Sequence, residues 1–395
     1  MNDCRIHRFR WLLHPTEAPR AFVRVTVQDR IIQEVADVPA DERHLAHGTL
    51  IPPLVNAHTH LEFSSLPAPI EPPLPFTHWI RNLVAWRRSQ ADSGRLDAVS
   101  RGVRELRQTG CRFVGEICTS AETHRHLIDA AINDIRIVSF REVLGFTRDR
   151  VTEQTQVLED HIANSSTDVS VGVSPHAPYS THPELVSAAA RIARENCLPL
   201  AMHLAETKEE RQLLESQTGP FRDLLEELAL WDDSVLQPGG SPLDYLQILA
   251  QVPRALAVHC NYLSHSEIQF LSDNQNIAAV YCPRTHRWFQ HSAHPIRKLL
   301  TAGATVVLGT DGRGSNPDLS IWDELTVAAE VLKSPIWELL PMVTTTAARA
   351  IGLQYCSIAE PGDSICGYVA TTSAESLSDL NRELGLLSGQ QLNSL

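Results

Sequence analysis

Hydrophobic and polar positions alternate in two different ways along this chain. Residues 21–28 alternate apolar and polar side chains with a period of two, and residues 31–36 follow in the same way, which is typical of half-buried strands. From residue 49 onward, apolar runs of the β type recur between longer segments with helical periodicity. Eight such runs are present, at residues 50–55, 113–117, 135–140, 169–174, 198–202, 255–258, 277–281 and 305–308.

Buried-type strands that alternate with helices predict parallel βαβ units, and eight of them predict a closed (β/α)8 or TIM barrel, an α/β fold. We expect this barrel over residues 49–354. The two ends of the chain, residues 1–48 and 355–395, are expected to meet in a small β-sandwich domain. Residues 357–372 have a strand-like pattern and would supply its C-terminal part.

The composition indicates a large folded core and excludes some partners. Of the 395 residues, 43% are hydrophobic, which is too many for a disordered chain. The formal net charge of −13 repels phosphate backbones, so we expect no nucleic-acid partner. The sequence has no apolar run of about 18 residues and no basic-then-apolar leader. We therefore expect a soluble cytoplasmic protein with no membrane partner.

The strongest motif for chemistry ends the first predicted barrel strand. It reads Asn-Ala-His-Thr-His-Leu-Glu at residues 56–62. Alternate residues of a strand point in the same direction, so His58 and His60 can bind one metal ion at the barrel mouth. The motif is short, and two polar residues that simply end a strand are the alternative interpretation.

Three further strands end in residues that can bind metal or transfer protons. The fifth is followed by His203 and Glu206, the sixth by His259, and the eighth by Thr310 and Asp311. These positions belong to the carboxyl-terminal rim, where barrel active sites are built. Each residue alone could be a helix cap or an ordinary hydrogen-bonded side chain. Together with the first strand, they predict a single catalytic site.

The order H-x-H, His-x-x-Glu, His and Thr-Asp resembles the amidohydrolase superfamily, and within it the mononuclear deaminase and chlorohydrolase branch. The resemblance covers residues 45–355, and the segments Ser-Pro-His-Ala-Pro-Tyr-Ser at 174–180 and Cys-Pro-Arg-Thr-His at 282–286 agree with it. It implies the amidohydrolase type of barrel and a homodimer. It also implies a set of metal ligands, namely His58, His60, His203 and Asp311.

The implied ligand set is chemically suited to one Zn2+ ion per chain. Three imidazoles and a carboxylate suit zinc with one position open for water, and the same donors accommodate Fe2+. A bound metal lowers the pKa of that water towards about 7, so hydroxide is available at neutral pH. Binuclear members of the family bridge two metals with a carboxylated lysine, but none of the three lysines of this chain ends a predicted strand. A mononuclear site, and deamination rather than amide hydrolysis, is therefore favoured.

The resemblance also assigns the proton transfers of a deaminase. Glu206 lies three residues beyond His203, close enough in sequence to reach the same site. It would protonate a ring nitrogen while hydroxide attacks the adjacent carbon. His259 would orient or deprotonate the water, and Asp311 would pass a proton to the departing ammonia.

The motifs at the mouth most resemble the aminodeoxyfutalosine deaminases of the alternative menaquinone route. This implies a small 6-aminopurine nucleoside-like substrate, either aminodeoxyfutalosine or an adenosine-type compound. Four residues are candidate substrate ligands: Glu62, His176, Trp79 and Arg284. Glu62 could accept hydrogen bonds from a ribose hydroxyl or a base edge, and Trp79 could stack on a purine. The simpler interpretations are an exposed carboxylate, a structural histidine, a packed tryptophan and a solvated charge.

Other functions stay open at the level of sequence. A chlorohydrolase would use the same residues to release chloride from a heteroaromatic ring, and a deaminase of guanine or another nucleobase would release ammonia from a different substrate. An amidase or hydantoinase would need a bridging lysine. A non-catalytic scaffold with a vestigial site would show no metal dependence.

Overall fold

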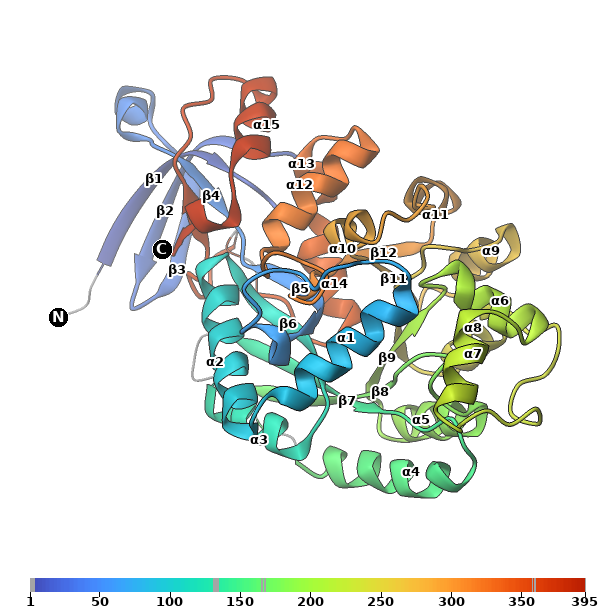
Figure 1. Cartoon of the computed structure of the whole chain (residues 1–395). Helices are drawn as coiled ribbons and strands as arrows, with labels where there is room; N and C mark the ends of the chain where they lie inside the picture. Colours follow the sequence, from blue (N-terminus) through green and yellow to red (C-terminus); the bar gives the residue numbers. More distant parts are fainter. Residues whose placement is uncertain are drawn as a thin grey trace.

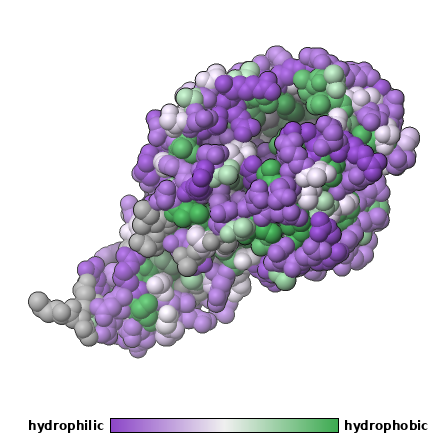
Figure 2. Space-filling view, turned by 90° about the horizontal axis from the view of Figure 1, so that it is seen from below, coloured by the Kyte–Doolittle hydropathy of each residue, from purple (hydrophilic) through white to green (hydrophobic). Residues whose placement is uncertain are grey.

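Two β-sheets organise the computed structural model, which describes residues 4–130, 135–164, 166, 168–356, 358 and 360–394. The larger sheet forms the body of the molecule, and the smaller one lies beside it, where both ends of the chain meet (Figure 1). The face seen in Figure 2 is mostly hydrophilic, with hydrophobic residues in small groups, some of them around a hollow. Among the helices of the described ranges, none combines the length and apolar composition that a membrane span requires.

The larger sheet is a closed parallel barrel. Its strands, in spatial order, are β5 (Leu54–His60), β6 (Cys111–Cys118), β7 (Arg136–Val143), β8 (Val169–Pro175), β9 (Pro199–Leu204), β10 (Arg254–His259), β11 (Ile277–Tyr281), β12 (Thr305–Leu308) and β13 (Asp311–Gly312). β12 pairs with β11, whereas β13 pairs with β5 at the opposite edge. Only residues 309–310 separate β12 from β13, so the two segments act as one eighth strand that closes the sheet. The predicted α/β barrel is confirmed.

Helices connect the strands, and most of them cover the outside of the barrel (Figure 1). Between β5 and β9 these are α1 (Phe76–Ser89), α2 (Asp92–Gln108), α3 (Ala121–Ala130), α4 (Asp149–Ile162) and α5 (Pro183–Glu195). Between β9 and β12 they are α6 (Lys208–Ser216), α7 (Pro220–Glu227), α8 (Pro242–Leu249), α9 (His265–Asp273), α10 (Pro283–Trp288) and α11 (Ile296–Ala302). The barrel ends with α12 (Ile321–Leu332), α13 (Ile336–Leu339) and α14 (Thr345–Ala350).

The smaller sheet joins strands from both ends of the chain. Its order is β15 (Asn393–Ser394), β14 (Tyr368–Ala370), β4 (Thr49–Ile51), β1 (Cys4–Leu12), β2 (Arg20–Gln28) and β3 (Ile31–Asp37). β14 pairs with β4, so the C-terminal tail rejoins the N-terminal strands as expected, whereas helix α15 (Leu377–Leu386) was not predicted. Of the expected small domain, residues 1–3, 357, 359 and 395 lie outside the described residues, and the domain boundaries stay a prediction.

One predicted strand spans two elements of the structure. The apolar run at residues 50–55 divides into the end of β4, in the smaller sheet, and the start of β5, in the barrel. Pro52 and Pro53 separate the two strands, because proline lacks the N–H group that a strand ladder needs. The chain therefore passes from one sheet to the other within two residues.

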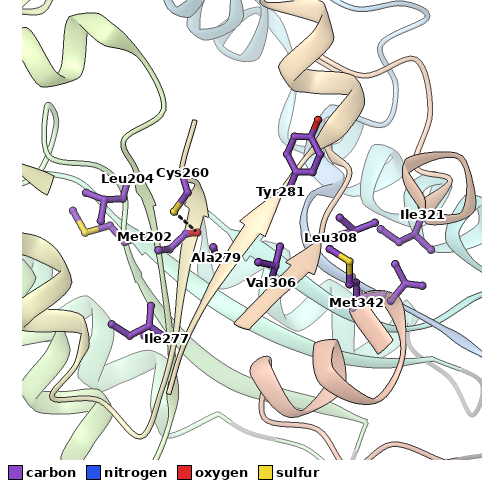
Figure 3. Close-up of a cluster of buried hydrophobic side chains, with 14 of the residues drawn as sticks. Met202, Leu204, Cys260, Ile277, Ala279, Tyr281, Val306, Leu308, Ile321 and Met342 are labelled. Atoms are coloured by element: carbon purple, nitrogen blue, oxygen red, sulfur yellow. Dashed lines mark hydrogen bonds between the residues drawn. The ribbon is translucent and has the colours of Figure 1, made fainter. Parts of the chain in front are cut away.

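Side chains of the barrel strands alternate between two apolar layers. On β9, Met202 and Leu204 point into the outer layer, between the strands and the helices, as Figure 3 shows. Ala201 belongs to the layer inside the barrel. His203 lies two residues further along the same side of the strand, so the regular period of two directs it towards the barrel interior.

A bulge near the end of β5 sets the direction of its histidines. From Asn56 to Thr59 the register advances by three residues on β5 but by only two on β6. Ala57 belongs to the inner layer, and the extra residue places His58 on the same side of the sheet. Gly309 of the neighbouring strand allows this arrangement, because a Cβ atom there would lie only 2.8 Å from the Cβ of His58.

Candidate active site

A cavity of about 740 Å³ opens at the carboxyl ends of the barrel strands. This volume lies in the range of small-molecule sites. The cavity floor is polar and includes His60, His203, Glu206, His259 and Asp311. Its walls are mostly apolar and come from α1, from the loop after β7 and from α7 with the loop that follows it.

Four side chains at the floor bring their donor atoms close together. Oδ1 of Asp311 lies 3.6 Å from Nε2 of His58 and 3.5 Å from Nε2 of His60. The Nε2 atoms of His60 and His203 are 3.4 Å apart. Tetrahedral ligands at about 2.0–2.1 Å from a zinc ion lie about 3.4 Å from one another. The observed spacings therefore fit one metal ion between the four residues.

Hydrogen bonds around this cluster leave the facing atoms available. Nδ1 of His203 donates to the main-chain carbonyl of His176 at 3.1 Å, which leaves Nε2 for a metal. The Ser315 hydroxyl donates to Oδ2 of Asp311 at 2.7 Å, which leaves Oδ1. Within the described part of the chain, neither ring nitrogen of the fully buried His58 has a hydrogen-bond partner. Buried polar atoms without a partner are costly, so this donor set is suited to a bound ion.

Burial and mutual electrostatic effects favour neutral His60 and His203 and an ionised Asp311. Burial lowers the pKa of His60 to about 3, and the neighbouring His58 adds to the effect. Burial also holds the pKa of His203 well below its ordinary value. For Asp311, burial by itself would raise the pKa, but the adjacent His58, His60 and His259 lower it overall. Neutral imidazoles and an ionised carboxylate are the forms that bind divalent cations.

Glu206 and His259 form a second pair beside the cluster. Oε1 of Glu206 lies 3.4 Å from Nε2 of His259, and the Tyr179 hydroxyl donates to Oε2 of Glu206 at 3.4 Å. Burial, reinforced by the negative charges of Asp311 and Glu210, raises the pKa of Glu206 well above its ordinary value. Burial lowers the pKa of His259 to about 3. The raised pKa of Glu206 favours its protonated carboxyl form, and the lowered pKa of His259 favours the neutral imidazole, so the pair is suited to act as acid and base.

Left-handed backbone occurs at three turns that carry the site. The φ angle is 53° at Ala205, 73° at His259 and 59° at Asp311. For residues with a side chain this conformation costs on the order of 1–3 kcal/mol each, and it persists only where surrounding contacts enforce it. The strain is located where the strands turn into the loops that present Glu206, His259 and Asp311.

Three of the four predicted substrate ligands line the cavity, namely Glu62, His176 and Trp79. Arg284 is not one of the described residues that line it. Its guanidinium group donates to Oε1 of Glu324 and to Oδ1 of Asp318, each at 2.7 Å. A guanidinium that is paired with two carboxylates outside the cavity has few donors left for a ligand, so we do not retain Arg284 as a substrate ligand.

Glu142 and Arg87 also line the cavity. The sequence places Glu142 after the third predicted strand, where it was only a weaker rim candidate with a solvated charge as the simpler interpretation, and Arg87 was not predicted as a site residue. Oε1 of Glu142 lies 4.0 Å from Nε2 of His176, and burial raises the pKa of Glu142 to about 7. Arg87, on α1, donates to Glu62 at 3.1 Å. The period of two on β7 could have indicated Glu142, because Phe140 lies inside the barrel two residues earlier. No sequence pattern indicates Arg87, whose contact depends on how α1 folds over the mouth.

Comparison with known proteins places this chain in a family. The model of the amidohydrolase family matches residues 49–363. A 5-methylthioadenosine/S-adenosylhomocysteine deaminase of Pyrococcus furiosus is 28% identical over 374 residues, which cover 88% of this chain and 80% of that protein. The Helicobacter pylori aminofutalosine deaminase in complex with methylthio-coformycin has a TM-score of 0.82 at 19% identity, over 98% of this chain and 99% of that one.

An adenosine deaminase from Xanthomonas campestris with bound zinc has a TM-score of 0.76 at 20% identity, over 98% of this chain and 90% of that one. At these identities the two solved structures show a shared fold. The family match covers most of the chain and contains all four residues of the proposed metal cluster. The chain therefore belongs to the amidohydrolase family.

Proposed function

We propose that this protein is a metal-dependent hydrolytic deaminase that releases ammonia from a 6-aminopurine nucleoside-like small molecule. One observation carries the proposal: the carboxyl group of Glu206, whose pKa burial raises well above its ordinary value, lies 3.4 Å from the imidazole of His259 beside a metal-type cluster on the cavity floor. The three similar proteins described above are all named as deaminases, which supports the same reaction.

The proposed cofactor is one Zn2+ ion per chain, held by His58, His60, His203 and Asp311. Fe2+ is the alternative ion for this donor set. When bound, such an ion lowers the pKa of a coordinated water towards about 7. None of the three lysines is among the described residues that line the cavity, which supports a site without a lysine-bridged second ion.

Three residues would move the protons of the reaction. Nε2 of His259 accepts a proton from the attacking water as its oxygen bonds to C6 of the purine. The carboxyl group of Glu206 donates its proton to the adjacent ring nitrogen, which removes aromatic character at that bond and stabilises the tetrahedral adduct. Asp311 takes the proton of the hydroxyl group of the adduct and passes it to the amino group, which leaves as ammonia while the ring carbon becomes a carbonyl. His259 then returns its proton to Glu206, which restores both groups.

The cavity walls support a nucleoside-like substrate. Glu62, His176 and Trp79 all line the cavity. Glu62 would accept hydrogen bonds from a sugar, whereas His176 and Trp79 would contact the base. Apolar side chains that are partly open to solvent line the outer wall of the cavity, among them those of Val84, Leu144, Leu228 and Leu230. This wall suits an apolar substituent beyond the sugar of the substrate. Aminodeoxyfutalosine is therefore the preferred candidate, which would place the enzyme in the alternative menaquinone route, and adenosine-type nucleosides are the second.

A substrate panel tests the proposal. Metal-replete protein is incubated with aminodeoxyfutalosine, adenosine, 5'-deoxyadenosine, guanine and a chlorotriazine, and ammonia, chloride and purine absorbance are followed. We expect ammonia release and an absorbance shift with at least one 6-aminopurine nucleoside, loss of activity on chelation, and recovery with Zn2+ or Fe2+. No turnover of any 6-aminopurine would contradict the assignment, and chloride release without ammonia would indicate a chlorohydrolase.

Homodimeric assembly and a cytoplasmic location, both expected from the sequence, are further proposals. Light scattering on a sizing column tests the first, with the mass of two chains as the expected result. Fractionation of the source cells tests the second.

A further inference from the structure

The loops that follow β9 and β10 are tied to each other next to the acid–base pair. The main-chain N–H of Tyr262 donates to the carbonyl of Ala205 at 3.0 Å. The side-chain amide of Asn261 donates to the main-chain carbonyl of Glu206 at 2.9 Å. Asn261 follows His259 by two residues, so these bonds connect the segment that carries the acid to the segment that carries the base.

Glu210, on α6, holds the same segment from the other side. Its Oε1 atom accepts from the main-chain N–H of Ala205 at 2.7 Å, and its Oε2 atom accepts from the main-chain N–H of Glu206 at 3.0 Å. The Glu210 side chain is fully buried. The backbone of Glu206 is therefore fixed at both ends of the residue, at its N–H by Glu210 and at its carbonyl by Asn261.

Neither Glu210 nor Asn261 is among the described residues that line the cavity, so neither would touch a substrate bound there. The turn that they fix is strained, because Ala205 has a left-handed backbone with φ of 53°. Such a turn needs outside contacts to persist, and the two bonds from Glu210 and the two from the β10 loop are contacts of this kind.

We propose that Glu210 and Asn261 are positioning residues, which clamp the main chain of Glu206 so that its carboxyl group stays against Nε2 of His259. The inference rests on the proposed function for the role of Glu206. It requires a carboxylate at position 210, because two neighbouring N–H donors need two acceptor oxygens. A glutamine has the same shape but offers one acceptor and one donor, so it leaves one N–H of the turn without a partner.

The first test is the Glu210→Gln variant, with Glu209→Gln as the matched control. Glu209 is the preceding residue of the same helix and is partly exposed. We expect Glu210→Gln to lower kcat by about 10- to 100-fold, because small displacements of an acid group are costly in rate. KM should stay within about threefold of wild type, because uniform substrate binding is not affected. Metal content should be unchanged, and the control should behave as wild type.

A double variant separates positioning from a general loss of structure. In a Glu206→Gln background, adding Glu210→Gln should lower the remaining rate by less than about threefold, because the clamp then has no acid to position. A full additional loss of rate in that background, or a Glu210→Gln enzyme with wild-type kcat, would overturn the inference.

Asn261→Asp replaces the side-chain donor to the Glu206 carbonyl by an acceptor of the same shape. If Glu210→Gln does not fold, Asn261→Asp is tested in its place, with the same expected results.

Crystal structures of wild type and Glu210→Gln keep this inference separate from the substrate assignment. We expect the Glu206 carboxyl group to move away from His259 by about 1 Å or more in the variant, while the metal cluster is unchanged. An unmoved carboxyl group would contradict the clamp whatever the substrate is. If wild-type protein deaminates no purine, the proposed function fails, and the crystallographic comparison still decides whether the clamp exists.

Discussion

Two groups of buried histidines in this protein differ in what their ring nitrogens face. At the barrel rim, the Nε2 atoms of His58 and His60 both face Oδ1 of Asp311, at 3.6 and 3.5 Å. Outside the barrel, His124 on α3 and His161 on α4 pack edge to face, with ring centroids 4.5 Å apart.

The outer pair is held by the main chain instead of by carboxylates. Nε2 of His124 donates to the carbonyl of Asn164 at 2.8 Å, and Nε2 of His161 donates to the carbonyl of Ser139 at 2.9 Å. No group of three or more metal-type ligands within the described residues includes either histidine. Their arrangement is that of structural side chains: His124 joins α3 to the segment after α4, and His161 joins α4 to β7.

The comparison of the two groups shows which observation indicates a metal site. Burial lowers the pKa in both groups, to about 3 for His60 and about 4 for His161. A lowered pKa therefore does not distinguish a metal ligand from a structural histidine. What distinguishes a metal ligand is that several ring nitrogens without other partners face the same carboxylate oxygen and one another. Neutral imidazoles gain little from facing each other unless a cation lies between them.

The largest expected effect is at the rim group. His60→Ala removes one of four ligands, so metal content should fall well below one ion per chain. Ammonia release should drop by about 1,000-fold or more, because a metal supplies several kcal/mol of transition-state stabilisation. Metal analysis and the ammonia assay measure both. His124→Ala is the matched control, and it should keep its metal. Unchanged metal content in His60→Ala would remove the distinction between the two groups.

Next in size is the loss of the proposed acid. Glu206→Gln should retain its metal and lose about 100- to 10,000-fold in kcat, the usual contribution of a general acid. Steady-state kinetics with metal analysis on the same preparation check this result. A near-normal rate would exclude Glu206 as the proton donor and leave the cluster without an assigned acid.

A smaller effect is expected at the outer group, on stability instead of on chemistry. His161→Ala leaves the Ser139 carbonyl without its donor and opens a small cavity beside β7, which should cost about 2–3 kcal/mol of unfolding free energy. Urea unfolding measures this loss. Metal content and kcat of the folded variant should match those of wild type, and a loss of metal would contradict the structural role.

A related effect is the pH dependence of stability that His161 contributes. Its pKa is about 4 in the folded protein and about 6.5 in an unfolded chain, so the unfolded state binds more protons between these values. The contribution is complete above pH 6.5 and is lost as the pH falls towards 4, by at most about 1.4 kcal/mol per pH unit. His161→Gln keeps a donor for Ser139 and should flatten this slope, and an unchanged slope would exclude the histidine as its source.

Most of the barrel could be predicted from the sequence because it depends on regular patterns. Apolar runs with the length of strands, separated by helical segments, predict the parallel barrel, and the observed strands overlap all eight runs. The error at residues 50–55 arose because hydrophobicity alone does not show that Pro52 and Pro53 separate two sheets. Helix α15 was missed because the C-terminal tail was interpreted only through its strand-like pattern.

The site was partly predictable for the same reason. His203 follows from the period of two on β9, and the H-x-H spacing puts two side chains on one face. The sequence does not show the bulge that turns His58 inward or the left-handed residues at His259 and Asp311. It also does not indicate Arg87 as part of the cavity, since its contact there depends on the folding of α1 over the mouth, whereas the period of two on β7 could have indicated Glu142.

Metal analysis combined with a crystal structure of zinc-loaded protein tests the central claim most directly. We predict one ion per chain, at about 2.0–2.2 Å from Nε2 of His58, His60 and His203 and from Oδ1 of Asp311. The same preparation should lose its ion when any one of these residues is replaced. An ion bound elsewhere, a second ion with equal occupancy, or no ion after zinc loading would contradict the account.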